Sequence, residues 1–130
     1  MISKNSMDFA EAGRVLAACY AAAAQREVAV SVAVVDDAGQ LLGFGRMDGA
    51  RAFTVELASR KARVAASVGV ATAIITEMSR QSPGVASDAA VGAGGMPVLH
   101  ERLCVGAVGV SGGKPEVDEL IAAAGVAALG

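Results

Sequence analysis

The sequence predicts a single α+β domain in which helices pack on an antiparallel sheet of four or five strands. Two pairs of short apolar segments, each pair joined by turn residues, predict one β-hairpin in each half of the chain. Segments with helical spacing precede, separate and follow these hairpins, an order typical of an antiparallel sheet with helices packed on it. The 130 residues are the length of one domain, which we place at residues 1–130.

In the N-terminal half, the apolar periodicity changes from that of a helix to that of a strand. We expect a helix from about 6 to 27, a strand over 28–35, a turn over 36–40 and a second strand over 41–47. Ser6 is the predicted N-cap of the helix. The first strand is almost continuously β-branched, as in strands that are buried on both faces. Gly43 and Gly45 in the second strand indicate a bulge, or a place where another group approaches the backbone.

The C-terminal half repeats this order with more helix. We expect helices over about 55–68 and 72–79, strands over 96–99 and 103–110 joined by a reversal at 100–102, and a final helix that begins at Pro115. Thr54 is the predicted cap of the first of these helices. Residues 80–95 show no clear periodicity, and a loop of this length in a small domain is more often functional than idle.

The composition argues against several classes of partner. The formal charge is −2 and the chain has three Phe, one Tyr and no Trp, whereas nucleic-acid binding needs a basic face and stacking aromatics. No segment approaches the roughly 20 apolar residues of a membrane span, and the N-terminal residues lack the pattern of a signal peptide, so we expect a cytoplasmic protein. The 54% of hydrophobic residues predicts that part of the apolar surface lies in subunit interfaces of a homo-oligomer.

The cysteines and the histidine do not form a metal-binding pattern. Cys19 and Cys104 are far apart in the sequence, and we expect two reduced, buried thiols. His100 is the only histidine, so no cluster of His, Cys and carboxylates has metal spacing and we predict no structural metal.

Several stretches of the chain resemble the GlcG/HbpS-like family of haem-binding or haem-degrading domains. They are residues 32–42 with 46–50, residues 59–65 at the family's KA-x-(T/V)-A helix, and residues 94–98 and 105–119 at its closing signature. Their order and spacing together are specific, and the resemblance covers about residues 6 to 129. It implies a profilin-like fold and a homo-oligomer, often an octamer. Some members bind haem and others lie among genes of catabolic pathways, so the family predicts fold better than function.

Lys61 is the charged residue with the most informative position. It lies in the predicted helix beside Arg60 and Arg63, five residues after Glu56, and it points partly towards the apolar side of the helix. A lysine against small apolar residues has a lowered pKa and can hold a carboxylate or act as a base. The alternative is that its side chain extends over the helix edge into water. Glu56 and Arg60 are four residues apart and can form a weak ion pair.

Two glycine-containing segments have both a binding and a structural interpretation. The backbone around Gly95 and Met96 can present N–H groups to an anion, or simply allow a tight entry into the strand. The segment from Ser111 to Pro115 resembles an anion site at a helix N-terminus, but the acids at 116, 118 and 119 would repel an anion and favour helix capping. Arg46, at the end of the first hairpin, either completes a pocket or forms a surface ion pair.

Three functional hypotheses follow. In the first, a small acidic or planar ligand binds near a subunit interface in a pocket formed by Arg46, Lys61, Gly95, Met96 and Ser111. In the second, the protein is an enzyme of a catabolic pathway that moves a proton on a small oxo or hydroxy acid. Lys61 or Glu56 then shuttles the proton and Arg46 holds the carboxylate. In the third, the protein is a structural or regulatory oligomer without a ligand.

Haem is the cofactor that the resemblance suggests. His100 is the candidate axial ligand, since imidazole commonly holds haem iron. Its place in the predicted reversal, however, is typical of a solvated side chain, and the chain is poor in the aromatic residues that often line a porphyrin pocket.

Overall fold

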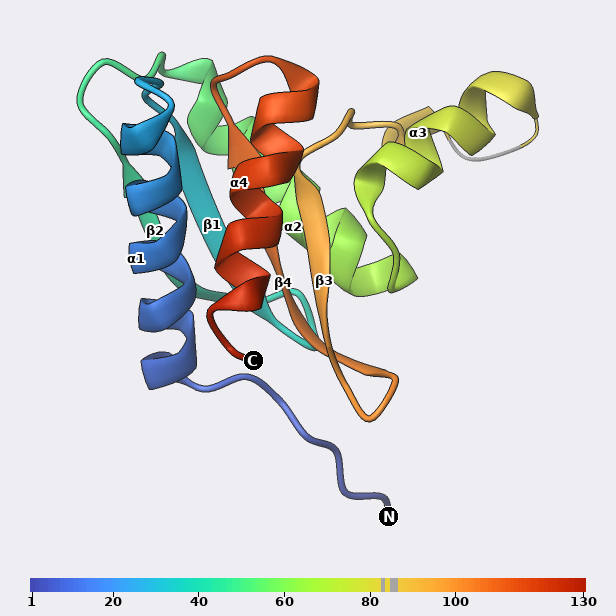
Figure 1. Cartoon of the computed structure of the whole chain (residues 1–130). Helices are drawn as coiled ribbons and strands as arrows, with labels where there is room; N and C mark the ends of the chain where they lie inside the picture. The colour runs from blue at the N-terminus through green and yellow to red at the C-terminus, as the bar shows by residue number, and fades with distance from the viewer. Residues whose placement is uncertain (83, 85–86) are drawn as a thin grey trace.

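Four antiparallel strands form the sheet in the part of the chain that the structure describes (Figure 1). The structure is a computed structural model that describes residues 1–82, 84 and 87–130. The strands are β1 (Ser31–Asp36), β2 (Leu41–Arg46), β3 (Gly95–His100) and β4 (Leu103–Ser111). Their order is β2-β1-β4-β3, so the two predicted hairpins meet along β1 and β4 at the centre of the sheet. The α+β class and the antiparallel sheet are therefore confirmed, with four strands.

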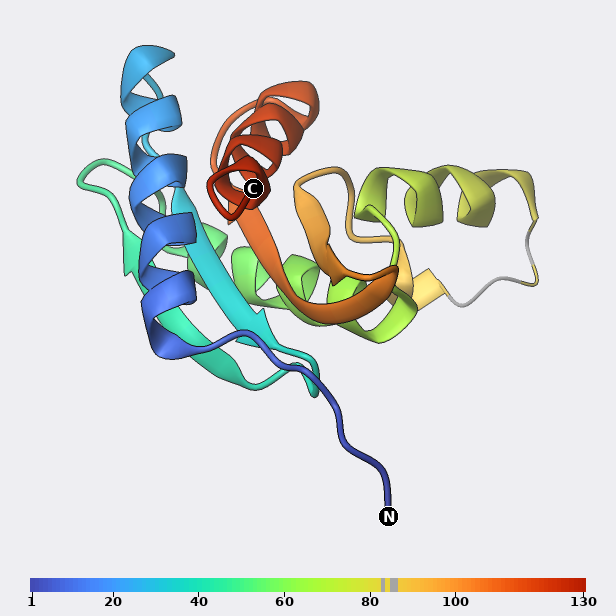
Figure 2. The same ribbon diagram turned by 60° about the horizontal axis from the view of Figure 1, so that its bottom comes forward.

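Helices cover both faces of this sheet. The helices α1 (Phe9–Gln25) and α4 (Pro115–Ala127) pack side by side on one face, and α2 (Phe53–Val68) packs on the other (Figure 2). The helix α3 (Thr72–Gln81) extends away from the sheet beyond β3 and is followed by a 3₁₀ turn, η1 (Ser87–Ala89). Part of the predicted 80–95 loop, at residues 83, 85 and 86, lies outside the described residues. In the part of the chain that the structure describes, no helix is long and apolar enough to cross a bilayer.

The strand β1 is buried on both faces, as its sequence predicts. Val32 and Val34 belong to the core beneath α1 and α4, whereas Ala33 and Val35 belong to the core beneath α2. This division follows from the alternation of side chains along a strand. The second core consists mainly of alanines, which allow α2 to lie close to the sheet.

Gly109 of β4 shows how close this approach is. A Cβ atom at this position would overlap the carbonyl oxygen of Ala58 and lie 2.5 Å from the backbone nitrogen of Ala62. Both atoms belong to the backbone of α2 and cannot turn aside as a side chain does. Only glycine therefore lets helix and strand pack at this distance.

The glycines of β2 both mark a bulge and allow other groups to approach the strand closely. The register against β1 shifts beside Gly43, which is the predicted bulge. Two side chains of α1 also lie over the strand: a Cβ on Gly43 would be 2.7 Å from Cδ1 of Leu16, and a Cβ on Gly45 would overlap the hydroxyl of Tyr20. The missing side chains thus let α1 rest on the sheet.

The N-cap of α1 lies two residues later in the sequence than predicted. Asp8, not Ser6, is the N-cap: its Oδ1 accepts a hydrogen bond from the Glu11 backbone nitrogen at 2.8 Å. Glu11 Oε1 accepts one in return from the Asp8 backbone nitrogen at 2.9 Å. This reciprocal capping box satisfies two helix N–H groups, whereas a serine at position 6 is too far back to reach them.

Thr54 does not cap α2, which contradicts the prediction. The helix begins at Phe53 without a side-chain cap, and Thr54 lies inside its first turn. The buried Thr54 hydroxyl instead donates to the carbonyl oxygen of Arg51 at 2.6 Å and shares a 2.8 Å hydrogen bond with Ser31 of β1. It joins helix to sheet rather than ending the helix.

Two further expectations need correction. His100 is the last residue of β3, and the reversal is made by Glu101 and Arg102, which have positive φ angles of 52° and 69°. Both cysteines are free, but only Cys19 is buried, while Cys104 is partly exposed.

Candidate functional site

Segments that are far apart in the sequence meet where β4 ends and α4 begins. Lys61 comes from α2, Gly94 immediately precedes β3, and Asp118 lies in the first turn of α4. Beside them is a hollow of about 220 Å³, which we call the Lys61 hollow. Its lining residues are Phe53, Leu57, Lys61, Val91, Gly92, Ala93, Ser111, Gly112, Gly113, Pro115 and Asp118. The segments that meet here include three of the stretches on which the family resemblance rests.

Lys61 connects α2 to α4 through its side chain. Only 4% of the residue is exposed, and its Nζ donates to the carbonyl oxygen of Val110 at 2.8 Å. The same Nζ lies 3.4 Å from Oδ2 of Asp118, with which it forms a buried ion pair. The alternative that Lys61 extends over the helix edge into water is therefore wrong.

Asp118 is held from its other side by the backbone. Its Oδ1 accepts a hydrogen bond from the Gly113 N–H at 2.8 Å, and the residue is 3% exposed. From the sequence, Asp118 is predicted only as one of three acids that repel an anion. The spacing along the helix indicates that Asp118 is buried. It lies three and four residues before Ile121 and Ala122, which occupy the buried side of α4.

Burial acts on both charges of the pair. Loss of hydration lowers the pKa of Lys61, and the charge and hydrogen bond of Asp118 only partly oppose this. Loss of hydration likewise raises the pKa of Asp118, against the backbone N–H of Gly113 and the nearby Lys61 charge. Both changes favour the neutral forms, so moving the proton from the ammonium to the carboxylate costs less here than in water.

Gly94 provides the space in which this pair lies. Its φ angle is 125°, and a Cβ atom would overlap the carbonyl oxygen of Val110. That Cβ would also lie 3.0 Å from Nζ of Lys61 and 3.1 Å from Cβ of Asp118. A glycine is therefore required at this position by both conformation and volume.

Gly95 and Met96 lie beside the Lys61 hollow rather than in its lining. The N–H of Gly95 donates to Oγ1 of Thr72 at 2.9 Å, and a Cβ on Gly95 would be 2.5 Å from the carbonyl oxygen of Lys61. The close packing of the strand entry accounts for this glycine, and its N–H is not free to bind an anion. Met96 packs against the core beneath α1 and α4.

Of the other predicted residues, Ser111 lines the Lys61 hollow, while Arg46 and Glu56 lie elsewhere. Arg46 is exposed at the end of β2, on an edge of the sheet. Glu56 is exposed on α2 and pairs at 3.2 Å with Arg63, not with Arg60. The structure therefore brings only Lys61 and Ser111 of the six predicted site residues together.

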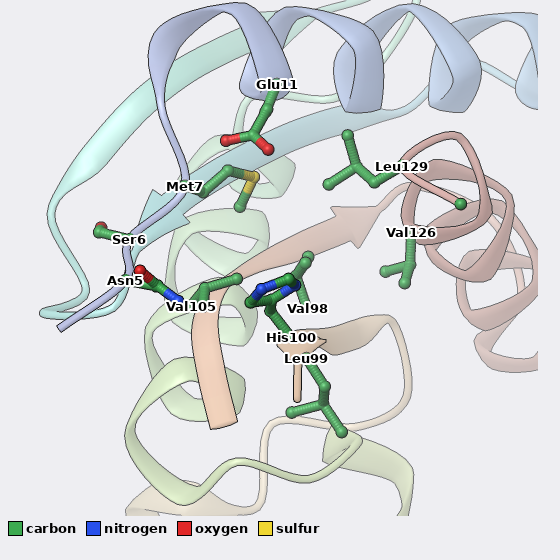
Figure 3. Close-up of a pocket in the computed structure, with 11 residues that line it drawn as sticks. Asn5, Ser6, Met7, Glu11, Val98, Leu99, His100, Val105, Val126 and Leu129 are labelled. Carbon is green, nitrogen blue, oxygen red and sulfur yellow. The ribbon is translucent and has the colours of Figure 1, made fainter. Parts of the chain in front are cut away.

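His100 lines a second hollow, of about 330 Å³, near the chain termini (Figure 3). We call it the His100 hollow. Its walls include the side chains of Met7, Glu11, Val98, Leu99, Val105, Val126 and Leu129. Figure 3 shows the imidazole next to Val98 and Val105, with Met7 and Glu11 of the N-terminal part above it. Among the described residues, no three His, Cys, Asp or Glu side chains are close enough together to hold a metal ion.

The family comparison agrees with the predicted resemblance. The model of the family described as haem degrading protein HbpS-like matches residues 7–127. This chain belongs to the HbpS-like family. A relative from Citrobacter freundii, an uncharacterized 15.0 kDa protein in the dhaT-dhaS intergenic region, is 32% identical in a 126-residue alignment that covers 90% of this chain and 87% of that protein.

Solved structures of HbpS-like proteins have the same fold. A double mutant of Streptomyces reticuli HbpS is 32% identical, with a TM-score of 0.93 over 100% of this chain and 91% of the other. Klebsiella pneumoniae ORFY is 31% identical, with a TM-score of 0.91 over 98% and 93%. A PduOC:heme complex is 28% identical, with a TM-score of 0.85 over 95% and 94%.

Proposed function

We propose that this HbpS-like protein binds a small organic molecule in the Lys61 hollow. The observation that carries the proposal is the Lys61–Asp118 ion pair, whose side chains are 5% and 4% exposed and which lines a hollow with apolar walls. Burying two charges costs hydration that their attraction often fails to offset. Perturbed titratable pairs in clefts are typical of functional sites, and an apolar pocket with few polar groups is typical of ligand binding.

The groups in the Lys61 hollow favour a ligand with a carbonyl or hydroxyl oxygen. The Lys61 ammonium can donate to such an oxygen, and the Asp118 carboxylate can accept from a hydroxyl. The side chains of Phe53, Leu57 and Val91 offer apolar contact to a short carbon chain. An acidic ligand, as predicted from the sequence, would compete with Asp118 for Lys61 and meet a carboxylate of like charge. We therefore favour a neutral ligand.

An NMR titration with hydroxyacetone, a small neutral hydroxy ketone, tests this proposal. We expect saturable shifts of the backbone amide signals of Ala93, Gly112 and Gly113, which line the hollow. Lys61→Met should abolish these shifts, and Lys114→Met, which alters an exposed lysine close by, should preserve them. Saturable shifts confined to residues outside the hollow, or no saturable shifts in the wild-type protein, would refute the proposal.

The proton-transfer enzyme is the alternative function, but the structure brings fewer of its predicted catalytic residues together. Lys61 is placed beside a proton acceptor, Asp118, but Arg46 and Glu56 are not in the same hollow. Such an enzyme would have to use the Lys61–Asp118 pair alone. Exchange of deuterium into 2-oxo acids at a rate above that of a Lys61→Met control would support it.

Haem binding is a second candidate, and the His100 hollow is the observation that favours it. An exposed imidazole stands beside apolar side chains, and a histidine is a common protein ligand of haem iron. The family is described by haem degradation, and one related structure is a haem complex. Ligand pockets span about 300–1,000 Å³, so the His100 hollow of about 330 Å³ would take only part of a haem, and His100 would be the residue that holds its iron.

A hemin titration followed by absorbance tests this candidate. Wild-type protein should shift the Soret band and saturate at a fixed stoichiometry, and His100→Ala should lose the shift. Lys61→Met should keep it, because Lys61 does not line the His100 hollow. An unchanged spectrum in His100→Ala would exclude this histidine as the ligand, and a band that never saturates would argue against specific binding.

A further inference from the structure

We infer that Lys61 forms an imine with a small aldehyde or ketone in the Lys61 hollow, and that Asp118 carries the protons of this reaction. The inference rests on the proposed binding function and assigns a chemistry to it. Its basis is the position of a primary amine that reaches a hollow with apolar walls and has a carboxylate 3.4 Å away.

Lys61 differs from the other lysines of the chain in its surroundings. The chain has three lysines, and Lys4 and Lys114 are exposed. An exposed lysine is almost fully protonated near neutral pH and is a poor nucleophile. A desolvated lysine has a larger neutral fraction, which is how proteins activate this side chain for attack on carbonyl compounds. Lys61 is the lysine that meets this condition.

Two contacts fix the amine for such a reaction. The carbonyl oxygen of Val110 accepts one N–H of Lys61 at 2.8 Å, and Asp118 accepts a second at 3.4 Å. Asp118 is itself held by the N–H of Gly113, so both Lys61 and Asp118 have fixed positions. Once Asp118 has taken a proton, rotation about the Cε–Nζ bond turns the lone pair of Lys61 towards a carbonyl compound in the hollow.

The proposed reaction starts with a proton transfer. Asp118 takes a proton from the Lys61 ammonium, which leaves a neutral amine and a carboxylic acid. The nitrogen lone pair attacks the carbonyl carbon, a C–N bond forms, and the electrons of the C=O π bond move to the oxygen. That oxygen takes the proton from Asp118, and Asp118 then removes one proton from the nitrogen.

Loss of water completes the imine. The hydroxyl group of the carbinolamine leaves as water with the proton held by Asp118, while the nitrogen lone pair forms the C=N bond. The product is a protonated imine paired with the Asp118 carboxylate. In sum, one ammonium and one carbonyl compound give one iminium and one water, so the step needs no oxidant or reductant.

Trapping with cyanoborohydride tests the inference. The reagent reduces an imine to a stable secondary amine, and peptide mass spectrometry then measures the label on each lysine after incubation with hydroxyacetone. We expect at least about tenfold more label on Lys61 than on either exposed lysine. A Lys4→Arg/Lys114→Arg double variant should be labelled to the same extent at Lys61. Lys61→Arg keeps the cation and should lose that label.

A separate variant, Asp118→Asn, tests whether Asp118 carries the protons. Asp118→Asn keeps an oxygen that can accept from the Gly113 N–H but cannot carry a proton. Because general acid–base catalysis typically contributes 10²–10⁴-fold, labelling of Lys61 should slow by about a hundredfold. An unchanged labelling rate would overturn the assignment of Asp118.

The remaining outcomes separate imine formation from binding. Equal labelling of all three lysines, or no label above a control without hydroxyacetone, would overturn the inference. If the amide shifts at the hollow persist in such a sample, the proposed binding function stands without the imine. If the shifts are also absent, both proposals fail.

Discussion

Lys61 and Asp118 place two opposite charges in the interior of a small domain. The pair links α2 to α4 and is almost entirely removed from water. Replacing a buried ion pair by apolar residues is often neutral or stabilising, so stability alone is a weak explanation for these charges. Their contact with a hollow gives them a second explanation, which is chemistry on a bound molecule.

Removal of one charge should cost more than removal of both. Lys61→Met leaves the Asp118 carboxylate buried without its cation, and we expect the free energy of unfolding to fall by about 3 kcal/mol. Lys61→Met/Asp118→Leu should return to within about 1 kcal/mol of wild type, because no buried charge is left. Urea unfolding at neutral pH measures both values. Equal destabilisation in the single and the double variant would show that the loss comes from packing instead.

The raised pKa of Asp118 predicts a dependence of stability on pH. The folded protein binds this proton more tightly than the unfolded chain does, so the associated stability is present below the ordinary carboxyl pKa and is lost as the pH rises through the folded pKa. The free energy of unfolding of wild type, relative to Asp118→Asn, should therefore fall as the pH rises above about 4, the ordinary carboxyl pKa. Urea unfolding of both proteins at a series of pH values from about 4 upwards checks the sign, and a difference that is constant or rises would contradict it.

At the scale of helices and strands, the sequence predicts which elements exist better than where they begin. The periodicity gives four strands and the major helices, but Asp8 replaces Ser6 as a cap because only its carboxylate reaches the Glu11 N–H. The sequence predicts Thr54 as a cap because its type suits that position. Its hydroxyl instead forms a hydrogen bond with Ser31, and this contact spans 23 positions of the sequence.

The residues of the candidate site are likewise predictable only where local sequence determines their position. Lys61 was predictable because its place on one helix shows the direction in which it points. Asp118 was not singled out, since its partner lies 57 positions away on the other side of the sheet. Arg46 and Glu56 have suitable chemistry, but no local pattern shows that they lie on an edge strand and on the exposed side of α2.

The contact between α2 and β4 depends on a single missing side chain. Gly109→Ala would push a methyl group into the backbone of α2 at Ala58 and Ala62, and we expect a loss of at least about 3 kcal/mol, the upper end of overpacking costs. Gly13→Ala on the exposed part of α1 is the matched control, because a Cβ there meets nothing within 4 Å. It should gain about 0.5–1 kcal/mol through helix propensity. Chemical denaturation of both variants measures these opposite signs, and equal effects would be inconsistent with the packing.

At the scale of the whole molecule, the surface keeps many large apolar side chains. The exposed ones include Phe9, Leu41, Phe53, Ile74, Met78, Leu99, Leu103 and Leu120. Such residues are suited to subunit contacts. The homo-oligomer expected from composition and the octamer implied by the resemblance stay predictions. Light scattering after size-exclusion chromatography should give a multiple of the 12.8 kDa chain mass. A clean monomer would contradict the interface argument.

We propose that the stretches which carry the family resemblance build a ligand site around Lys61 and Asp118. A crystal structure of the protein soaked with hydroxyacetone would show whether this site is occupied. We predict density for the ligand in the Lys61 hollow, with its oxygen atoms within hydrogen-bond distance of Lys61 Nζ or the Asp118 carboxylate. Ligand density only elsewhere, with the hollow holding nothing but water, would contradict the claim.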